Sequence, residues 1–217
     1  MFFTRSMTIS DEELIGAVPA ARSKPAAGQA DTALVERLRS GEAEAYEELV
    51  DRFSGEIYGL AFRLTSDAAD AADITQEVFI QAFRSIEGFR GEANLRTWLF
   101  RIVVNRARNR FRWWKRKRRD TTYSIDAPIG DGDATIADSL IDRSSSPEQD
   151  AIDSERMRAL TKALAELKPI YREAVILADV EGLSYRECSA ALGIDIGTVR
   201  SRISRGRDEL RQRLKDI

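Results

Sequence analysis

The 217-residue sequence contains no histidine and one cysteine, Cys188. Without histidine the chain lacks an imidazole for a Ser-His-Asp or Cys-His nucleophile, for acid–base catalysis or for zinc binding in an HExxH motif. One cysteine excludes an internal disulfide and fits a reducing compartment. Enzymes that bind magnesium through Asp and Glu stay open, but catalysis is a poor first hypothesis.

Long hydrophobic runs are also absent. No stretch approaches the roughly 20 apolar residues that span a bilayer, and residues 1–30 hold no apolar run long enough for a secretory signal. These absences predict a cytoplasmic protein without membrane insertion. Residues 1–30 are rich in Ala, Pro, Ser and Gly, and we expect them to form a flexible N-terminal extension.

The formal net charge of −2 hides a strong segregation of charge along the chain. Acids dominate residues 31–77, whereas residues 101–119 contain ten Lys and Arg and no acid. Residues 120–153 are acidic again, with Arg143 as the one base. Such asymmetry indicates that different parts of the chain face different partners. The base-only stretch favours contact with nucleic acid over a merely solvated helix face.

Apolar periodicity indicates helices in the first half of the chain. Apolar residues recur at three- and four-residue steps over 34–64, with breaks or bends expected at Gly41 and Gly55. A second helix follows the capping signal Ser66-Asp67, and Asn94 can cap a third, long helix. No window alternates with period two for long enough to predict a strand. The fold class is therefore predicted to be all-α.

The polar stretch between the two helical regions divides the chain. We predict a helical bundle over 31–119, a flexible acidic linker over 120–153 and a second helical domain over 154–217. The linker contains Pro, Gly and a run of serines and is too polar to bury a core. A structureless run of this length is unusual inside one compact domain. The sequence therefore predicts two small helical domains joined by this linker.

The second domain carries the signals of a helix-turn-helix. Pro169 suits the first position of a helix, and Ser184 with Glu187 forms a capping box that begins a short helix. Gly193 supplies the turn, and a last helix begins near Asp195 and ends beyond Leu210. This order of helix, turn and helix is typical of DNA-binding proteins.

Polar side chains are expected on the outward side of the last helix. Arginine pairs bidentately with guanine edges or with phosphates, and this helix is rich in arginine. The alternative is an ordinary helical hairpin with a basic surface. Cys188 occupies an apolar helix position and is predicted to be a buried small hydrophobe. The expected outward set is Arg200, Ser201, Ser204, Arg205 and Arg207.

All three tryptophans, Trp98, Trp113 and Trp114, lie in the third long helix and its basic extension. Aromatics mixed with arginine suit unstacked bases, which need a stacking surface and neutralised phosphates. Trp98 can equally be a core residue, and both roles stay open.

Three segments together resemble the extracytoplasmic-function (ECF, group IV) sigma factors of RNA polymerase. The order and spacing of the three are far more specific than any one alone, and the resemblance covers 31–119 and 154–214. Asp195 stands where many members have proline. The segments are DAADITQEVF at 70–79, FRGEANLRTWL at 89–99 with VNR at 104–106, and GIDIGTVRSR at 193–202.

The resemblance implies a role in transcription initiation that needs no cofactor, metal or catalytic residue. The helix at 70–79 would bind core RNA polymerase, and the loop at 89–94 would capture a flipped base of the melted nontemplate strand. The implied polymerase-binding residues are Asp70, Asp73, Gln76 and Glu77. The implied minus-ten residues are Phe89, Arg90, Asn94, Trp98, Arg101, Asn105, Arg106 and Arg110.

The resemblance also assigns the second domain and the linker. The helix-turn-helix would read the minus-thirty-five element of promoter DNA as duplex, through the five outward residues of the last helix. The acidic linker would follow the path that nascent RNA later takes through polymerase. The resemblance further implies that the chain acts in stress or envelope-response transcription and that an anti-sigma factor inhibits it.

Two other readings compete with the sigma-factor interpretation. An autonomous helix-turn-helix regulator would bind duplex DNA without polymerase, but it leaves the acidic and the tryptophan-rich helices without roles. A carboxylate-metal nuclease or phosphotransferase would use Asp70, Asp73 and Glu77. No second acidic cluster or phosphate-binding loop accompanies those acids in the sequence.

Overall fold

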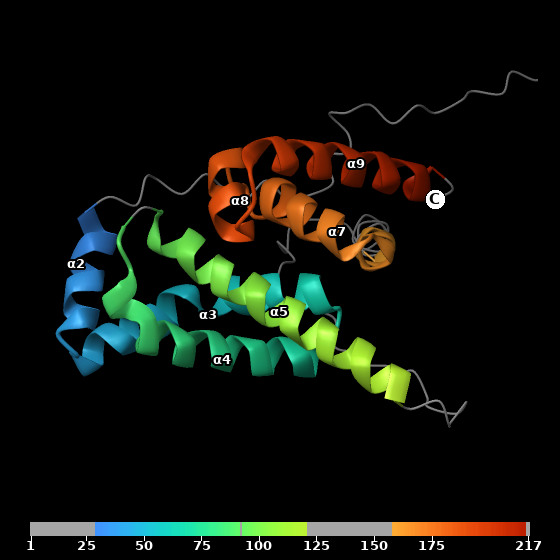
Figure 1. Cartoon of the computed structure of the whole chain (residues 1–217). Helices are drawn as coiled ribbons and strands as arrows, with labels where there is room; N and C mark the ends of the chain where they lie inside the picture. Colours follow the sequence, from blue (N-terminus) through green and yellow to red (C-terminus); the bar gives the residue numbers. More distant parts are fainter. Residues whose placement is uncertain (1–28, 92, 121–157, 216–217) are drawn as a thin grey trace, which may run out of the picture.

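The computed structural model describes residues 29–91, 93–120 and 158–215, and every regular element in these ranges is helical (Figure 1). The all-α prediction is therefore confirmed. Most of the predicted N-terminal extension and of the predicted linker lies outside the described residues. Gln29 and Ala30 differ from the expectation, because they already belong to the first helix.

The first group of helices packs three long helices, α3 (Ala43–Thr65), α4 (Ala68–Ser85) and α5 (Leu95–Asp120), around one core. It also includes the shorter helix α2 (Gln29–Arg39) and a 3-10 turn η1 (Ile86–Gly88). The largest fully buried side chains include Leu49, Ile57, Ile74, Leu99 and Phe100, from α3, α4 and α5. Each of these three helices contacts the other two.

Local capping explains where the helices of this group begin. Asp67 Oδ1 accepts a hydrogen bond of 2.7 Å from the Asp70 amide at the start of α4. Asn94 Oδ1 does the same for the Thr97 amide at the start of α5, also at 2.7 Å. Both caps satisfy an amide that the helix itself leaves without a partner. The predicted starts of these two helices are confirmed.

The predictions for the two glycines had different outcomes. Gly41 has a φ of +78° and separates α2 from α3, so the predicted break is confirmed. A break or a bend was predicted at Gly55, and the break does not occur, because α3 continues through this residue. One glycine costs a helix about 1 kcal/mol, and burial of Phe53 and Ile57 on either side outweighs this cost.

The second group contains a helix described over 158–166, then α7 (Pro169–Val175), a π-helical turn η3 (Ile176–Val180), α8 (Tyr185–Leu192) and α9 (Ile196–Leu214). Pro169 is the first residue of α7, as predicted. The π-helical turn was not predicted. Val199, Ile203 and Leu210 of α9 are buried, and α9 packs mainly against α7.

The two groups of helices lie against one another. Figure 1 shows α8 lying beside α5, and α7 following it along the same side, with α9 on the outside. Contacts also join α3 to α7 and to η3. The sequence predicted two helical units but did not predict this contact between them.

Candidate nucleic-acid interface

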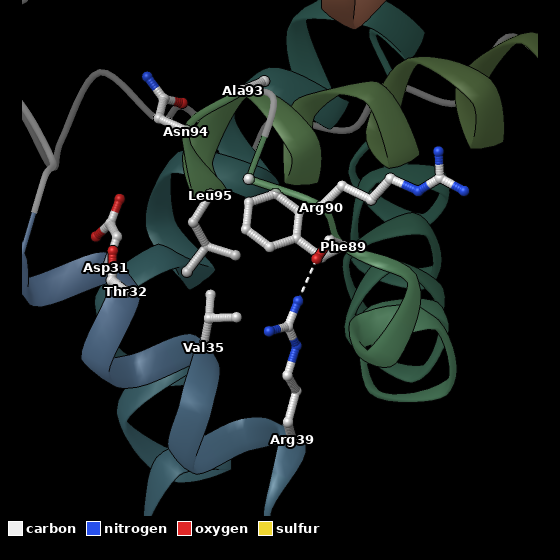
Figure 2. A pocket seen from close by; sticks show the side chains of 10 residues that line it. Asp31, Thr32, Val35, Arg39, Phe89, Arg90, Ala93, Asn94 and Leu95 are labelled. Atoms are coloured by element: carbon white, nitrogen blue, oxygen red, sulfur yellow. Dashed lines mark hydrogen bonds between the residues drawn. The ribbon is translucent and has the colours of Figure 1, made fainter.

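A cavity of about 410 Å³ lies between α2 and the loop that precedes α5 (Figure 2). Figure 2 shows Val35 and Leu95 pointing toward one another at its base, with the Phe89 ring beside them. The lining combines apolar side chains with an acid, two arginines and an amide. The lining residues are Asp31, Thr32, Val35, Arg39, Phe89, Arg90, Gly91, Ala93, Asn94 and Leu95.

Backbone and capping contacts fix the loop that lines this cavity. Gly91 has a φ of +71°, a left-handed conformation that favours glycine. The Arg39 guanidinium donates to the Phe89 carbonyl oxygen and so ties the loop to α2 (Figure 2). Asn94 caps α5 through its side-chain oxygen. The Gly91 conformation and these two hydrogen bonds fix the path of the loop that lines the cavity.

Phe89, which lines the cavity, packs against Trp98. Their ring centroids lie 5.2 Å apart at 56°, and Phe89 is buried while Trp98 is half-buried. The sequence placed Phe89 among the residues that contact DNA, but the structure places most of its ring in the core. Trp98 packs against the core and stays partly exposed, so it has the core role, and its stacking on a base stays a prediction.

The predicted minus-ten residues of α5 lie on two different faces. Arg101 and Asn105 are exposed. Arg106 and Arg110 instead turn toward α4, where Arg106 Nη2 donates to Gln81 Oε1 at 3.0 Å and Arg110 Nη2 to Asp73 Oδ2 at 2.6 Å. The basic helix therefore offers only part of its charge to a nucleic acid.

The acids of α4 that the sequence assigned to polymerase contact are the partners of these arginines. Arg110 Nε lies 3.1 Å from Asp70 Oδ1, and Arg106 Nη1 lies 3.3 Å from Glu77 Oε2. Burial opposes the charged form of Arg110, but the hydrogen bond to Asp73 and the charge of Asp70 outweigh it and raise the pKa of Arg110. Gln76, Asp73 and Glu77 are exposed, whereas Asp70 is half-buried.

The helix-turn-helix has the capping contacts that the sequence predicts. The Ser184 amide donates to Glu187 Oε2 at 2.8 Å, and the Glu187 amide donates to Ser184 Oγ at 3.3 Å, which completes the capping box. Gly193 has a φ of +66° at the turn. Asp195 accepts from the Gly197 amide at 2.7 Å and begins α9 without a proline.

The outward face of α9 carries four of the five predicted polar residues. Arg200, Ser201, Ser204 and Arg205 are exposed. The Arg207 side chain is 40% exposed and lies on the same side of α9 as Arg200, seven positions earlier. Its guanidinium differs from the other four because it forms a bidentate ion pair with Asp179, at 3.0 Å and 2.6 Å.

Cys188 is buried in the core between α8 and α9, as predicted. Its thiol donates to the Leu183 carbonyl oxygen at 3.6 Å. Burial is the main reason that its pKa rises to about 12, and the charges of Glu187 and Asp179 act in the same direction. The thiol is therefore protonated at neutral pH and is a packing group in the folded protein.

Sequence reasoning missed the part that α2 plays in the cavity and the ion pairs between the two groups of helices. Asp31 and Arg39 line the cavity although they lie about 50 residues before the loop. Glu173 and Glu181 are buried charged residues that pair with arginines of the first group. Neither feature leaves a periodic signal, because each joins residues far apart in the chain.

No set of three or more candidate metal ligands gathers within residues 29–91, 93–120 or 158–215. Two of the acids considered for a metal-dependent enzyme, Asp70 and Asp73, instead contact Arg110. The helices of the described ranges include none that is long and apolar enough to cross a membrane.

Comparison with known proteins places both halves of the chain in one kind of protein. Residues 49–119 match the family model of sigma-70 region 2, and residues 157–210 match that of sigma-70 region 4. The RNA polymerase sigma-H factor of Pseudomonas aeruginosa is 34% identical over 86% of this chain and 95% of its own length. The ECF RNA polymerase sigma-E factor of Haemophilus influenzae is 36% identical over 86% of this chain and 96% of its own length.

A solved structure extends the likeness to three dimensions. The sigma factor RpoE of Bartonella quintana, solved in complex with the anti-sigma factor NepR, aligns with a TM-score of 0.61 at 26% identity. The alignment covers 80% of this chain and 98% of that one.

Proposed function

Because the chain belongs to the extracytoplasmic-function family of RNA polymerase sigma factors and therefore acts in transcription initiation, we propose how its residues divide the work. The cavity beside α5 receives one unstacked base of the nontemplate strand, α9 reads duplex DNA upstream, and α4 binds core polymerase.

The cavity is the observation that carries the proposal. It is apolar at its base, polar at its rim and large enough for a base, and it lies at the start of the basic helix α5. Arg90 on the loop and Arg101 and Asn105 on α5 are exposed beside it and supply contacts to the strand. Binding energy for the splayed strand offsets unstacking, which costs a few kcal/mol per base step. Melting therefore needs no bond to be made or broken.

The outward face of α9 supports reading of the minus-thirty-five element. Arg200 and Arg205 reach base edges or phosphates in the major groove, and Ser201 and Ser204 are small enough to let the helix approach closely. We leave Arg207 out of this set because its guanidinium is paired with Asp179.

Asp73, Gln76 and Glu77 form the exposed polar surface of α4 that we assign to core polymerase. A polymerase-bound protein acts in the cytoplasm, and we assign no catalytic activity to this chain. The complex of Bartonella quintana RpoE with an anti-sigma factor supports an inhibitor of the same class here.

The function is tested by footprinting promoter DNA with the free chain, with core polymerase and with both. We expect a melted minus-ten region only with both, and weak duplex binding by the free chain because its net charge is −2. Tight, footprinted binding by the free chain at physiological salt would instead support the autonomous helix-turn-helix regulator.

A further inference from the structure

Two carboxylates of the second group of helices are buried against arginines of the first group. Glu173 of α7 and Glu181 after η3 are 7% and 6% exposed. A buried carboxylate is costly unless it is paired and hydrogen-bonded. The partners of these two are Arg108 of α5 for Glu173, and Arg63 of α3 with Arg96 of α5 for Glu181.

The geometry of these pairs is that of anion recognition. Arg108 binds Glu173 through Nε, at 3.0 Å and 3.1 Å from the two carboxylate oxygens, and through Nη2 at 2.7 Å. Arg96 Nη2 lies 3.1 Å from Glu181 Oε2, and Arg63 contacts the other oxygen. The Arg96 guanidinium also lies 4.4 Å from the centre of the Phe100 ring. The guanidinium fork fits phosphate as well as it fits carboxylate.

A third contact between the two groups of helices lies beside the cavity. Asn94 Nδ2, at the rim of the cavity, donates to Glu187 Oε1 of α8 at 2.8 Å. Burial opposes ionisation of Glu187, but its hydrogen bonds with Ser184 and Asn94 outweigh burial and lower the pKa of Glu187. Three carboxylates of the second group thus follow one line from the cavity along α5.

We propose that Arg63, Arg96 and Arg108 form a binding row for the phosphates of single-stranded DNA. Glu173 and Glu181 occupy this row in the closed chain, while Glu187 holds Asn94 at the rim of the cavity. The proposal rests on the proposed function, since it continues the path of the strand whose base enters the cavity. From residue 96 to residue 108, α5 rises about 18 Å, a length that spans several phosphates of an extended single strand.

The closed arrangement therefore competes with the strand but leaves the outward face of α9 open. Arg200 and Arg205 stay exposed while the arginine row is covered. Separating the two groups of helices exposes Arg63, Arg108 and the rim of the cavity together, while Arg96 keeps its contact with Glu56 of α3 through Nε at 2.5 Å and offers its Nη atoms. Any partner that pulls the second group away from α5 then releases the site for the melted strand.

The experiment measures binding of a short fluorescent single-stranded oligonucleotide to the free full-length chain at low salt. The test variant is Glu173→Gln with Glu181→Gln, which removes the competing charges at nearly constant shape. The control, Glu36→Gln with Glu44→Gln, removes two charges from exposed positions of α2 and α3. If the closed form holds about 90% of the molecules, affinity in the test variant rises about tenfold, and the control shows no such gain.

A third variant adds Arg63→Gln, Arg96→Gln and Arg108→Gln to the two glutamate changes, and the gain is expected to disappear. Small-angle scattering checks that the test variant expands. If it stays compact, Glu173→Lys with Glu181→Lys forces separation, with Glu36→Lys and Glu44→Lys as its control.

An expanded variant that binds the strand no better than its control overturns the proposal. A gain that survives loss of the three arginines overturns it as well, and so does a lysine variant that stays compact. Open-complex formation by the unaltered chain with core polymerase is measured in parallel. If open complexes form while the gain is missing, the binding row fails and the proposed function stands; if they do not form, the proposed function fails.

Discussion

Asp31 is the one acid among the described residues that line the cavity, and it is 6% exposed. Arg52 Nη2 lies 2.5 Å from its Oδ1, yet neither oxygen has a hydrogen-bond partner of good geometry within the described ranges. A carboxylate accepts a hydrogen bond from the exocyclic amino group of adenine or cytosine, which guanine and thymine do not present at the same position. Both oxygens of Asp31 are buried in this structure, and we predict that a base that enters and reaches them is selected by this contact.

We predict that Asp31→Asn reduces the preference for an amino-bearing base by about 1–3 kcal/mol. An amide both donates and accepts, so it no longer distinguishes the bases by this contact. The measurement is open-complex formation on promoters that differ only at the flipped position. Arg52→Gln is the control, since it removes the ion pair and leaves the cavity lining intact. Unchanged base preference in Asp31→Asn would contradict the assignment.

Arg205 tests the outward face of α9 in the same way. If it reads a base edge, Arg205→Ala costs about 1–3 kcal/mol at one promoter position and relaxes the preference there. Arg211, further along α9 and paired with Asp208 at 2.9 Å, is the control residue. Binding to a set of upstream promoter variants by holoenzyme gives the comparison. An equal loss of binding across all promoters would show that Arg205 contacts only phosphate.

The thiol of Cys188 gives a test of burial that does not depend on DNA. Its pKa of about 12 keeps it protonated, so we expect no reaction with a thiol reagent in the folded protein at pH 8 and rapid reaction in urea. The folded-state pKa lies above the ordinary value of 9.0. The neutral, buried thiol therefore contributes its full share to the free energy of unfolding below about pH 9, and this contribution is lost as the pH rises from there toward 12. Rapid labelling of the folded chain would contradict the packing of α8 on α9.

At the scale of single elements, the packing of α9 on α7 depends on Gly206. A Cβ atom added there would lie 2.5 Å from Val175 Cγ2 and 3.3 Å from the Tyr171 carbonyl oxygen. Overpacking costs about 1–3 kcal/mol, and alanine returns at most about 1 kcal/mol as the better helix former. We predict that Gly206→Ala lowers the free energy of unfolding, measured by urea denaturation.

Gly55 of α3 is the matched control for this substitution. It also lies inside a helix, but nothing lies within 4 Å of an added Cβ atom. Gly55→Ala should raise the free energy of unfolding by about 0.5–1 kcal/mol. Stabilisation by both substitutions would show that α7 and α9 are not in close contact at Gly206.

Elements whose signals are local were predictable from the sequence. The capping box of Ser184 and Glu187, the cap at Asn94 and the first-turn position of Pro169 each involve residues within a few positions of one another. Gly55 shows the limit of such signals, because α3 does not break there. Burial of α3 against other helices outweighs the local cost of glycine.

The candidate site was predictable only in part, because its contacts cross between elements. The loop at 89–94 was recognised from its residues, but its second wall on α2 was not. Arg106, Arg110 and Arg207 look alike in sequence, and their acidic partners on other elements decide which way they point. Burial of Phe89 likewise depends on Trp98, nine residues later.

At the scale of the whole molecule, folding divides the base-only stretch of the sequence among several surfaces. Arg106 and Arg110 serve the contact with α4, and Arg108 serves the contact with α7. Arg101 and Arg112 are exposed. A single run of positive charge thus contributes to the packing of α5 on α4, to the contact between groups and to the exposed surface that we assign to DNA.

The last prediction concerns the acidic segment 120–153, whose charge is visible in the sequence although residues 121–157 lie outside the described ranges. The path that nascent RNA takes through polymerase must have basic walls in order to hold RNA. An acidic segment on that path is attracted to these walls, and the growing transcript has to displace the segment. Replacing the acids with Ser and Asn at constant length removes this attraction and keeps the reach of the tether. The nine acids are Asp120, Asp126, Asp131, Asp133, Asp138, Asp142, Glu148, Asp150 and Asp153.

We expect the neutralised chain to bind core polymerase more weakly at moderate salt and to change the yield of abortive transcripts. A second variant with the same residues in scrambled order keeps both charge and length, and it should behave like the unaltered chain because the attraction depends on charge and not on order. Holoenzyme titration and transcript gels at two salt concentrations give both readouts. Unaltered affinity and unaltered abortive yields in the neutralised variant would leave the segment with the role of a tether alone.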